Sequence, residues 1–598
     1  MGRIGAPGPR VKPRARTGKR SLNPPIRNAD FRSMPRLSRI ALAGALLAFA
    51  ALRIAAVYTT AFNWDEFALF HDVALTAQTG ELHSAGHAGL PQAALLPLVR
   101  DCHDEIAVGR IARLAWLALT WSYLGAVFAV LYQLLPADRH RVHDAALGTA
   151  LLGLFPAFLE WSIQVRTDQV ALAGGAWGAA LLLASRRRAW LALVAGVALG
   201  VGWLGTQKLA YVAALAGLLA AGDLALRAEW RFRRETLRAV GALAGAALVV
   251  VGWRWFVSSA FAVAPGHAAM AGTSPETVRN YLDVFNFYRE TIGYSQYRAT
   301  LPALGPHLAL FAAMTAATLA MEQAHTSRLA LAWAVVALGT AVGAFHDAAF
   351  AYFLMTLGLF AVVALALALP AIRSAFGHRW PSSTRLATPV IWAALLLGAG
   401  MQTSLAFDDS QAVQRESLRF VHRNFSPDRA GFQPETALFC GVRQPIGLWF
   451  SQRIFRAFEG PQREREVETL IRRFRTEPVH YLVQSFRLNQ FPEPVRVFWD
   501  ENYQPYRGSV FVAGRRLRGE AGERSEFELL IAAPYRWLPL GNANTIRVDG
   551  ERVAPAETRM LGVGRHTVAF DSDQTRGLLV LAVDDPPRDA PISFYKAY

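Results

Sequence analysis

The chain has 598 residues, a formal net charge of +17 and a hydrophobic fraction of 53%. Its mean hydropathy of +0.22 is too high for an ordinary soluble enzyme, yet 18% charged residues is too many for a bare bundle of membrane helices. In a soluble chain this charge would indicate nucleic-acid binding, but the basic residues here fall between apolar stretches. We therefore expect membrane lipids, and no nucleic acid, as partners.

The first 38 residues are rich in Gly, Pro and Arg and show no apolar periodicity. This composition is typical of a disordered tail, which we place in the cytoplasm. The apolar run that starts near Ile40 is longer than the core of a signal peptide, and no clear cleavage site ends it. We interpret it as the first retained membrane span.

A membrane-spanning helix needs about 20 apolar residues. Such stretches lie near 39–60, 106–135, 145–161, 169–184, 189–205, 209–226, 239–262, 302–321, 328–345, 349–370 and 387–407. The sequence therefore predicts an all-α polytopic membrane bundle of about 11 transmembrane helices. Residues 189–226 are too long for one span, so we expect a tight turn at Thr206-Gln207-Lys208.

The charged residues predict the orientation of the bundle. Basic clusters follow alternate spans, at Arg139 and Arg141, Arg186 to Arg188, Arg227 to Arg238, and Arg373 to Arg385. With the tail in the cytoplasm they all fall on the cytoplasmic side, as the positive-inside bias requires. The loop at 61–105 is acidic and lies outside, and an odd number of spans places the C-terminal region outside too. We expect a multi-pass protein of a bacterial inner membrane.

Two outer loops are long enough to serve a function. The first, 61–105, has apolar residues at helical spacing and is expected to lie along the membrane surface. The second, 263–301, is rich in aromatic residues such as Tyr281, Phe285 and Tyr288. These rings either line a sugar or lipid groove or anchor the loop at the interface.

The chain becomes charged and mixed from Asp408 onward. In residues 408–525 the pattern predicts a helix at Glu464 to Thr476 and a strand at Val479 to Val483, an α/β region. In residues 526–598 short runs near 527–532, 545–549, 566–570 and 577–583 predict a small β-sandwich, with a hairpin turn at Val548-Asp549-Gly550-Glu551. Cys102 and Cys440 both face the oxidising side, and they are either a disulfide or two unrelated thiols.

Polar sites recur at the outer ends of the predicted spans. They are Asp65-Glu66, Arg166-Thr167-Asp168, Gln207-Lys208, and His346-Asp347 with Tyr352 following. Ionisable groups at the membrane are costly to place, so each is a candidate functional site. The simpler interpretations stay open: a helix cap for the acidic pair, ion pairs with neighbouring residues for Arg166 and Asp168, and a lysine that reaches the interface. Arg166 and Asp168 are too close in sequence to face each other on a helix.

These residue types suit the transfer of a sugar from a lipid phosphate. A carboxylate can take the proton from an acceptor hydroxyl as that oxygen attacks the anomeric carbon. Lys208 and Arg166 can stabilise the charge that develops on the departing phosphate.

With these motifs, residues 39–407 resemble the GT-C fold glycosyltransferases, particularly bacterial relatives of protein O-mannosyltransferases and aminoarabinose transferases. The resemblance implies that Asp65 is the catalytic base and that Glu66 supports it or contacts the acceptor. It also implies that Lys208 and Arg166, with Gln207, bind the donor phosphate. Asp168, His346 and Tyr352 are then expected at the substrate. The sparse outer carboxylates favour a mechanism without a metal or other cofactor.

The expected function is thus an inverting hexosyl- or pentosyltransferase. It would move a sugar from a polyprenyl-phosphate donor to a hydroxyl of a glycan, lipid or protein on the outer face. A transporter or flippase of lipid-linked or envelope glycans is the main alternative, although no convincing pair of inverted repeats is found. A non-catalytic assembly or sensor protein with a glycan-binding terminal region is a third.

Overall fold

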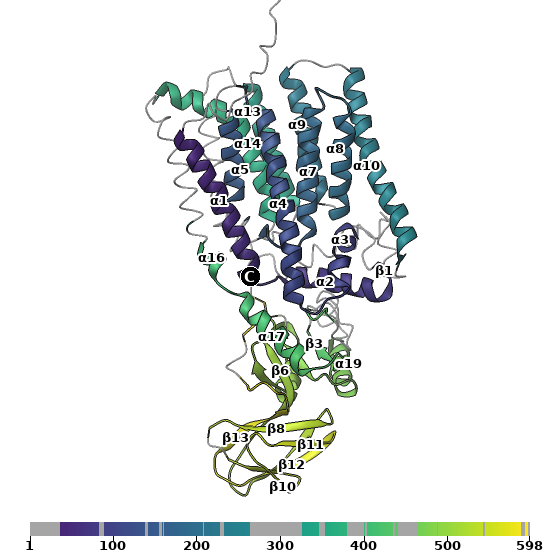
Figure 1. Cartoon of the computed structure of the whole chain (residues 1–598), viewed down its shortest axis with the longest axis vertical. Coiled ribbons are helices and arrows are strands. Elements are labelled where there is room, and N and C mark those ends of the chain that lie inside the picture. The colour runs from purple at the N-terminus through teal and green to yellow at the C-terminus, as the bar shows by residue number, and fades with distance from the viewer. Residues whose placement is uncertain are drawn as a thin grey trace, which may run out of the picture.

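The computed structural model describes residues 36–82, 89–137, 141–154, 158, 161–206, 208–227, 232–263, 326–345, 353–379, 400, 403–427, 429–433, 437–440, 463–486, 488–541, 544–587 and 592–595. A bundle of helices forms one part of the molecule, and a β-rich region extends from one end of it (Figure 1). The first outer loop lies at that same end, between the two parts.

The helices of the bundle follow the apolar stretches of the sequence. They are α1 (Arg36–Thr59), α4 (Glu105–Leu134), α5 (Arg141–Gly153), α7 (Thr167–Ala184), α8 (Leu191–Gly205), α9 (Leu209–Arg227), α10 (Phe232–Ala260), α13 (Thr326–Phe345), α14 (Leu354–Arg379) and the short α16 (Thr403–Phe407). α8 ends at Gly205 and α9 begins at Leu209, on the two sides of the expected turn. The predicted span at 302–321, most of the one at 387–407 and most of the tail lie outside the described residues.

By length and apolarity, three described helices could each cross a bilayer, namely α4, α10 and residues Met355–Ile372 of α14. A fourth is added if α1 and the following helix, bent by 66°, count as one broken span. The other apolar helices in the described part are shorter, so the predicted number of about 11 spans is not confirmed. Among these shorter helices, α5 has 13 residues and α8 has 15.

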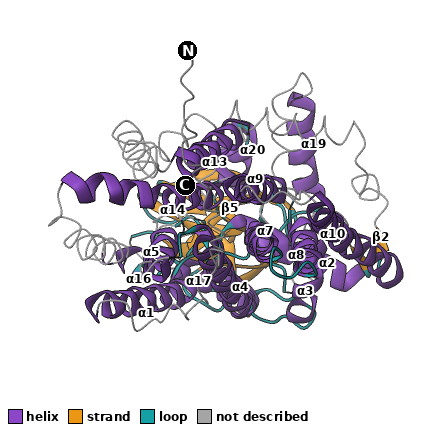
Figure 2. Ribbon diagram, turned by 90° about the horizontal axis from the view of Figure 1, so that it is seen from above, coloured by secondary structure: helices purple, strands orange, loops and turns teal. Residues whose placement is uncertain are grey.

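α1 and α10 lie at opposite edges of the bundle when it is viewed along the helices (Figure 2). In α10 only 11% of the apolar window is buried, and Leu243 and Trp255 are exposed. Such an apolar and uncovered face is expected to contact lipid. α7, in contrast, packs its small residues, including Gly174 and Gly175, against α8 and α9.

The first outer loop folds into α2 (Trp64–Thr79), β1 (Glu81–Leu82) and α3 (Gly89–Val99), as its helical spacing predicted. α2 ends at Gly80, whose φ of 71° closes the helix in the left-handed region. β1 pairs with β2 (Ala262–Val263), which directly follows α10. The start of the second outer loop therefore lies at the same end of the bundle as the first.

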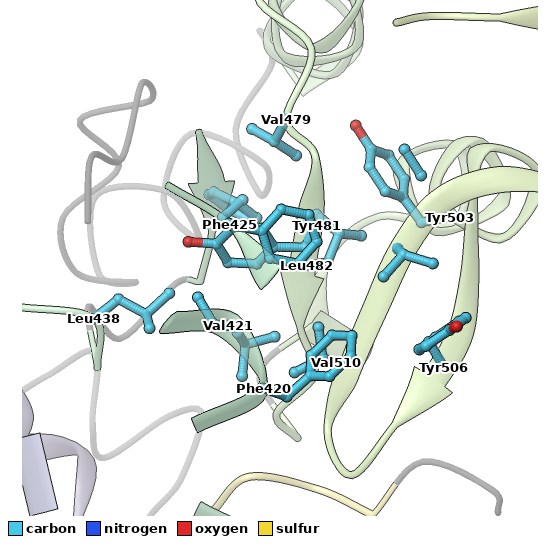
Figure 3. Packing of buried hydrophobic residues seen from close by; sticks show 14 of the residues in the cluster. Phe420, Val421, Phe425, Leu438, Val479, Tyr481, Leu482, Tyr503, Tyr506 and Val510 are labelled. Atoms are coloured by element: carbon cyan, nitrogen blue, oxygen red, sulfur yellow. The ribbon is translucent and has the colours of Figure 1, made fainter. Parts of the chain in front are cut away.

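The C-terminal region begins with α17 (Gln411–Asn424), β3 (Gly431–Phe432), α19 (Arg463–Thr476), β4 (Tyr481–Val483), the 3-10 turn η5 (Leu488–Gln490), α20 (Glu493–Asn502), β5 (Tyr503–Arg507) and β6 (Val510–Gly519). α19 and β4 are the helix and strand that the sequence predicts. Figure 3 shows Phe420 and Val421 of α17 in one packed cluster with Tyr481 of β4 and Tyr506 of β5. α17 is thus fixed on the sheet by its apolar face.

The chain ends in β7 (Arg524–Leu529), β8 (Ala533–Pro539), β9 (Ile546–Val548), β10 (Glu551–Val553), β11 (Thr558–Leu561), β12 (Gly564–Phe570) and β13 (Thr575–Leu581). Two sheets form, in the orders β10-β9-β12-β7 and β11-β8-β13-β6-β4-β3. The predicted hairpin is confirmed, because Val548 pairs with Glu551 across Asp549 and Gly550, whose φ angles are 52° and 85°. β6 pairs with β13, so one sheet runs from the α/β region into the β-sandwich.

One hydrophobic core joins the first outer loop to the C-terminal region. Phe67 of α2 packs its ring against Phe439, Phe594 and Tyr595, with centroids 5.6 to 6.1 Å apart. Cys102 and Cys440 form a disulfide across the same junction, which the sequence had left open. These contacts fix the C-terminal region against the loop that carries Asp65.

Candidate functional site

The acidic pair Asp65-Glu66 lies in the first turn of α2, and the two carboxylates have different surroundings. Asn63 caps the helix: its side-chain oxygen accepts the N–H of Asp65 at 2.9 Å, and its own N–H donates to Glu66 Oε2 at 2.8 Å. This is a capping box, the simpler interpretation that the sequence allowed. The cap turns Glu66 inward and leaves the side chain of Asp65 partly exposed.

Glu66 has no solvent exposure and forms a two-point ion pair with Arg113 of α4. Arg113 Nε donates to Oε1 at 2.8 Å and Nη2 donates to Oε2 at 2.6 Å. Oε1 also accepts the N–H of Val165 at 2.9 Å. Because its donors come from the N-cap of α2, from α4 and from Val165, Glu66 fixes the α1–α2 linker against the segment that precedes α7. These contacts favour the supporting role for Glu66 over direct proton transfer.

Asp65 begins a row of alternating charges that crosses three segments of the bundle end. Its Oδ2 lies 2.6 Å from Arg166 Nη1, and Arg166 Nε lies 3.6 Å from Asp168 Oδ2. Asp168 Oδ1 in turn accepts a hydrogen bond from Lys208 Nζ at 2.9 Å. The structure therefore brings together Asp65, Arg166, Asp168 and Lys208, which we name the charge row.

Arg166 and Asp168 can meet because Arg166 is not helical. It occupies the N-cap of α7 with φ of −127° and ψ of 150°, an extended conformation, whereas Asp168 lies in the first turn. On a continuous helix residues i and i+2 would point to different sides. The sequence indicated that Arg166 and Asp168 pair with neighbours, and they do so with Asp65 and Lys208. The extended N-cap also brings the two residues within 3.6 Å of each other, which helical spacing did not predict.

Neutral groups hold Arg166 in place. The side-chain oxygen of Gln164 lies within 3.4 Å of both Arg166 Nη1 and Asn63 Nδ2, and so connects the row to the cap of α2. The indole N–H of Trp116 donates to the carbonyl of Arg166 at 2.9 Å, and the guanidinium lies 5.6 Å from the ring centre of Trp161. Arg166 is thus held from α4, from the preceding loop and from its own helix.

The charge row has no net charge when no ligand is bound, and its cations can still bind an anion. Its two carboxylates and two cations balance, and α2 and α7 begin beside it, so their positive dipole ends face it. The side chains of Arg166 and Asp168 are 6% and 11% exposed, whereas those of Asp65 and Lys208 are 30% and 23% exposed. A ligand therefore reaches the row at its two ends, and an incoming phosphate would compete with the carboxylates for Arg166 and Lys208.

The remaining predicted site residues, Gln207, His346 and Tyr352, lie outside the described residues, and their roles stay predictions. Sequence reasoning missed Arg113 and Gln164 as parts of the site. A signal for Arg113 existed, because an arginine inside the apolar stretch at 106–135 is costly in a membrane without a partner. Across the part of the chain that the structure describes, no group of three His, Cys, Asp or Glu could hold a metal ion.

No protein-family model matches the sequence, and no curated protein matches it. Among solved structures, the chain is similar to the oligosaccharyltransferase of Archaeoglobus fulgidus, solved with zinc and sulfate. The identity is 13% and the TM-score 0.43, over 78% of this chain and 71% of that one. It is also similar to ArnT of Cupriavidus metallidurans bound to undecaprenyl phosphate, with 14% identity and a TM-score of 0.38, over 76% of this chain and 93% of that one.

An oligosaccharyltransferase and a protein that holds undecaprenyl phosphate are thus among the structures that this chain is similar to. Identities of 13 to 14% and TM-scores below 0.5 describe a distant likeness. The roles assigned below therefore depend on the contacts inside this chain.

Proposed function

We propose that the chain is an integral membrane glycosyltransferase that moves a sugar from a polyprenyl phosphate to an acceptor hydroxyl at the charge-row end of the bundle. The observation that carries the proposal is the charge row itself. A partly exposed carboxylate lies 2.6 Å from a guanidinium, and a lysine completes the row beyond a second carboxylate. The row supplies a base and two phosphate-binding cations at the end of apolar helices, where the headgroup of a lipid would lie.

In the proposed reaction Asp65 is the base. The acceptor oxygen attacks the anomeric carbon, its proton passes to a carboxylate oxygen of Asp65, and the bond between the anomeric carbon and the phosphate oxygen breaks. The products are the glycosylated acceptor and the polyprenyl phosphate. Attack from the face opposite the leaving phosphate inverts the anomeric centre, and no other reactant is needed.

Arg166 and Lys208 are the proposed partners of the phosphate. Both are bound to carboxylates in this structure, so the donor phosphate would replace part of those ion pairs rather than meet bare cations. Negative charge grows on the phosphate as the glycosidic bond breaks, and two fixed cations stabilise that charge more in the transition state than in the bound donor. Asp168 then positions the two cations in the absence of a donor.

The acceptor is proposed to approach from the side of the C-terminal region. That region packs on α2 through Phe67 and is linked to the first loop by Cys102 and Cys440. It therefore lies at the end of the bundle at which α2 and α3 are found (Figure 1). A glycan, lipid or protein acceptor, and a hexose or pentose donor, are all compatible with this arrangement.

The proposal is tested in a strain that lacks this chain, by mass spectrometry of its lipid-linked sugars and surface glycans. We expect one polyprenyl-phosphate sugar to accumulate and one glycan modification to disappear. The wild-type chain should restore both, whereas Asp65→Asn should lower transfer by about 10² to 10⁴, the usual contribution of a general base. Asp101→Asn, a change at an exposed carboxylate of the same loop, is the matched control.

A purified chain in detergent micelles separates the enzyme from a flippase. Micelles have no two sides, so a flippase makes no product there, whereas a transferase glycosylates an acceptor supplied with the lipid-linked donor. Equal transfer by Asp65→Asn and the wild type, at equal protein levels, would show that the charge row does not perform this chemistry.

A further inference from the structure

A second basic site lies on the outer side of α17, away from the charge row. It is a groove of about 320 Å³, which we name the arginine groove. The charged residues that line it are Arg415, Glu416, Arg419, Arg423, Arg507 and Asp585. None of them was selected from the sequence, and none belongs to the site described above.

The charges of the arginine groove do not balance. Four guanidinium groups face two carboxylates, which leaves two positive charges in excess. Arg507 Nε donates to Glu416 at 2.9 Å, and Arg423 Nη1 donates to Asp585 at 3.1 Å, so both carboxylates of the lining are already engaged. Arg415 binds Asp409 just outside the groove at 2.5 Å. Arg419 is exposed and forms no ion pair with any residue that the structure describes.

The spacing of the arginines suits a phosphoryl group. Residues 415, 419 and 423 are four positions apart on α17, so they share one face with about 6 Å between successive positions. A guanidinium binds phosphate with two parallel N–H donors, and adjacent forks can bind different oxygens of the same group. The groove is hollow rather than flat, so an anion in it would contact several forks at once.

The arginine groove lies close to the bundle and hence to the expected membrane surface. α17 begins four residues after α16, whose last residue, Phe407, is exposed. The opposite face of α17 holds the α1–α2 linker, because Gln414 Nε2 donates to the carbonyl of Phe62 and Gln414 Oε1 accepts the Phe62 N–H. The groove is therefore separated from the linker that precedes Asp65 by about the 10 Å width of one helix.

We propose that the arginine groove binds the phosphoryl group of an anionic ligand, and that the ligand is a lipid headgroup or a soluble phosphate ester. Both sources present the same chemistry to the three arginine forks. The membrane source is expected to bind better, because a headgroup held beside the groove has a high local concentration. This binding does not depend on glycosyl transfer at the charge row.

The test is hydrogen exchange, followed by mass spectrometry, of the full chain in phosphatidylcholine nanodiscs. One arm adds phosphatidic acid to the discs, and the other adds soluble glycerol 1-phosphate. We expect slower exchange in peptides that cover α17 when phosphatidic acid is present. Arg415→Gln/Arg419→Gln/Arg423→Gln should need roughly tenfold more phosphatidic acid for half of the effect, since three partly exposed ion pairs are lost.

Two further variants keep the test decisive. Arg419→Gln alone breaks no ion pair between described residues, so it should weaken binding without disturbing the fold. The charge-matched control Arg516→Gln/Arg518→Gln/Arg552→Gln changes exposed arginines of β6 and β10 and should bind as the wild type does. If exchange in α17 slows only with phosphatidic acid, the ligand is a lipid headgroup. If exchange slows with both phosphatidic acid and glycerol 1-phosphate, the groove binds phosphate esters in general. If neither ligand slows exchange in α17, or if the triple α17 variant responds as its control does, the proposal is wrong.

Discussion

Arg113 of α4 and Glu66 of α2 form a two-point ion pair in which neither side chain has any solvent exposure. Arg113 also donates to the backbone carbonyls of Thr60 and Ala61 in the α1–α2 linker. The pair therefore fixes the linker whose cap exposes Asp65. It lies directly beside the charge row but leaves no carboxylate oxygen for a substrate.

Glu66→Gln leaves the positive charge of Arg113 buried and only partly compensated. We expect it to destabilise the chain by about 3 to 5 kcal/mol, the usual cost of breaking a buried ion pair from one side. The readout is the Tm of the detergent-purified chain, with the exposed Glu468→Gln as the matched control. Glu66→Gln/Arg113→Met should recover part of the loss, because no charge is then buried alone. Equal Tm values for Glu66→Gln and the control would contradict the role given to the pair.

Lys208→Gln tests the far end of the charge row. Lysine is rare in this chain, with four lysines against 58 arginines. The composition would therefore favour arginine at position 208, but the residue is a lysine, whose ammonium group is a more compact charge. We expect the Gln variant to lower kcat by about 10² to 10³, the usual effect of removing one electrostatic contact to a developing charge. Lys208→Arg keeps the charge and should lose less. Wild-type kcat in the Gln variant, measured with the donor saturating, would remove Lys208 from the mechanism.

His422 of α17 predicts a pH dependence of stability. Its Nε2 lies 2.8 Å from the buried carboxylate of Glu105, and this hydrogen bond raises the pKa of His422 above its ordinary value despite partial burial. The added stability is fully present below the unfolded pKa of about 6.5 and is lost as the pH rises through the folded value.

The Tm of the wild-type chain should therefore fall as the pH rises above about 6.5. His422→Gln should remove most of this slope, whereas His103→Gln, at an exposed position, should keep it. A slope that His422→Gln leaves unchanged would assign the titration to another group.

The disulfide between Cys102 and Cys440 closes a loop of 338 residues between the first outer loop and the C-terminal region. Its removal by Cys102→Ser/Cys440→Ser should cost about 2 to 5 kcal/mol, mainly because the unfolded chain gains freedom. The bond itself is checked by inserting a protease site near residue 230. After cleavage the two fragments should migrate together on a non-reducing gel and separate on a reducing one, and separation without reductant would show that no bridge forms.

Several elements were predictable because the information that specifies them is local. The apolar stretches at 106–135 and 209–226 became α4 and α9, and the turn signal Asp549-Gly550 became a hairpin with two positive φ angles. A helical period or a turn preference is expressed within a few residues, so no knowledge of packing is needed. α8 also ends at Gly205, where the sequence predicts the end of a span, although its 15 residues are few for a bilayer.

The site was only half predictable. The sequence by itself determined which charged residues stand at the ends of apolar stretches, and so named Asp65, Glu66, Arg166, Asp168 and Lys208. It did not determine their partners. Lys208 meets Asp168 across 40 residues because α7 and α9 pack side by side. Arg113 meets Glu66 across 47 residues because the capping box of α2 turns Glu66 toward α4.

The tertiary structure alone therefore decided which acidic residue supports the fold and which is exposed to a substrate. It also decided that Cys102 meets Cys440 and that three arginines of α17 share a groove with Arg507 of β5. The physical reason is the same in each case. Composition and spacing determine the charge of a segment and which of its faces is apolar. The geometry of a contact between distant segments is instead set by how helices and sheets pack.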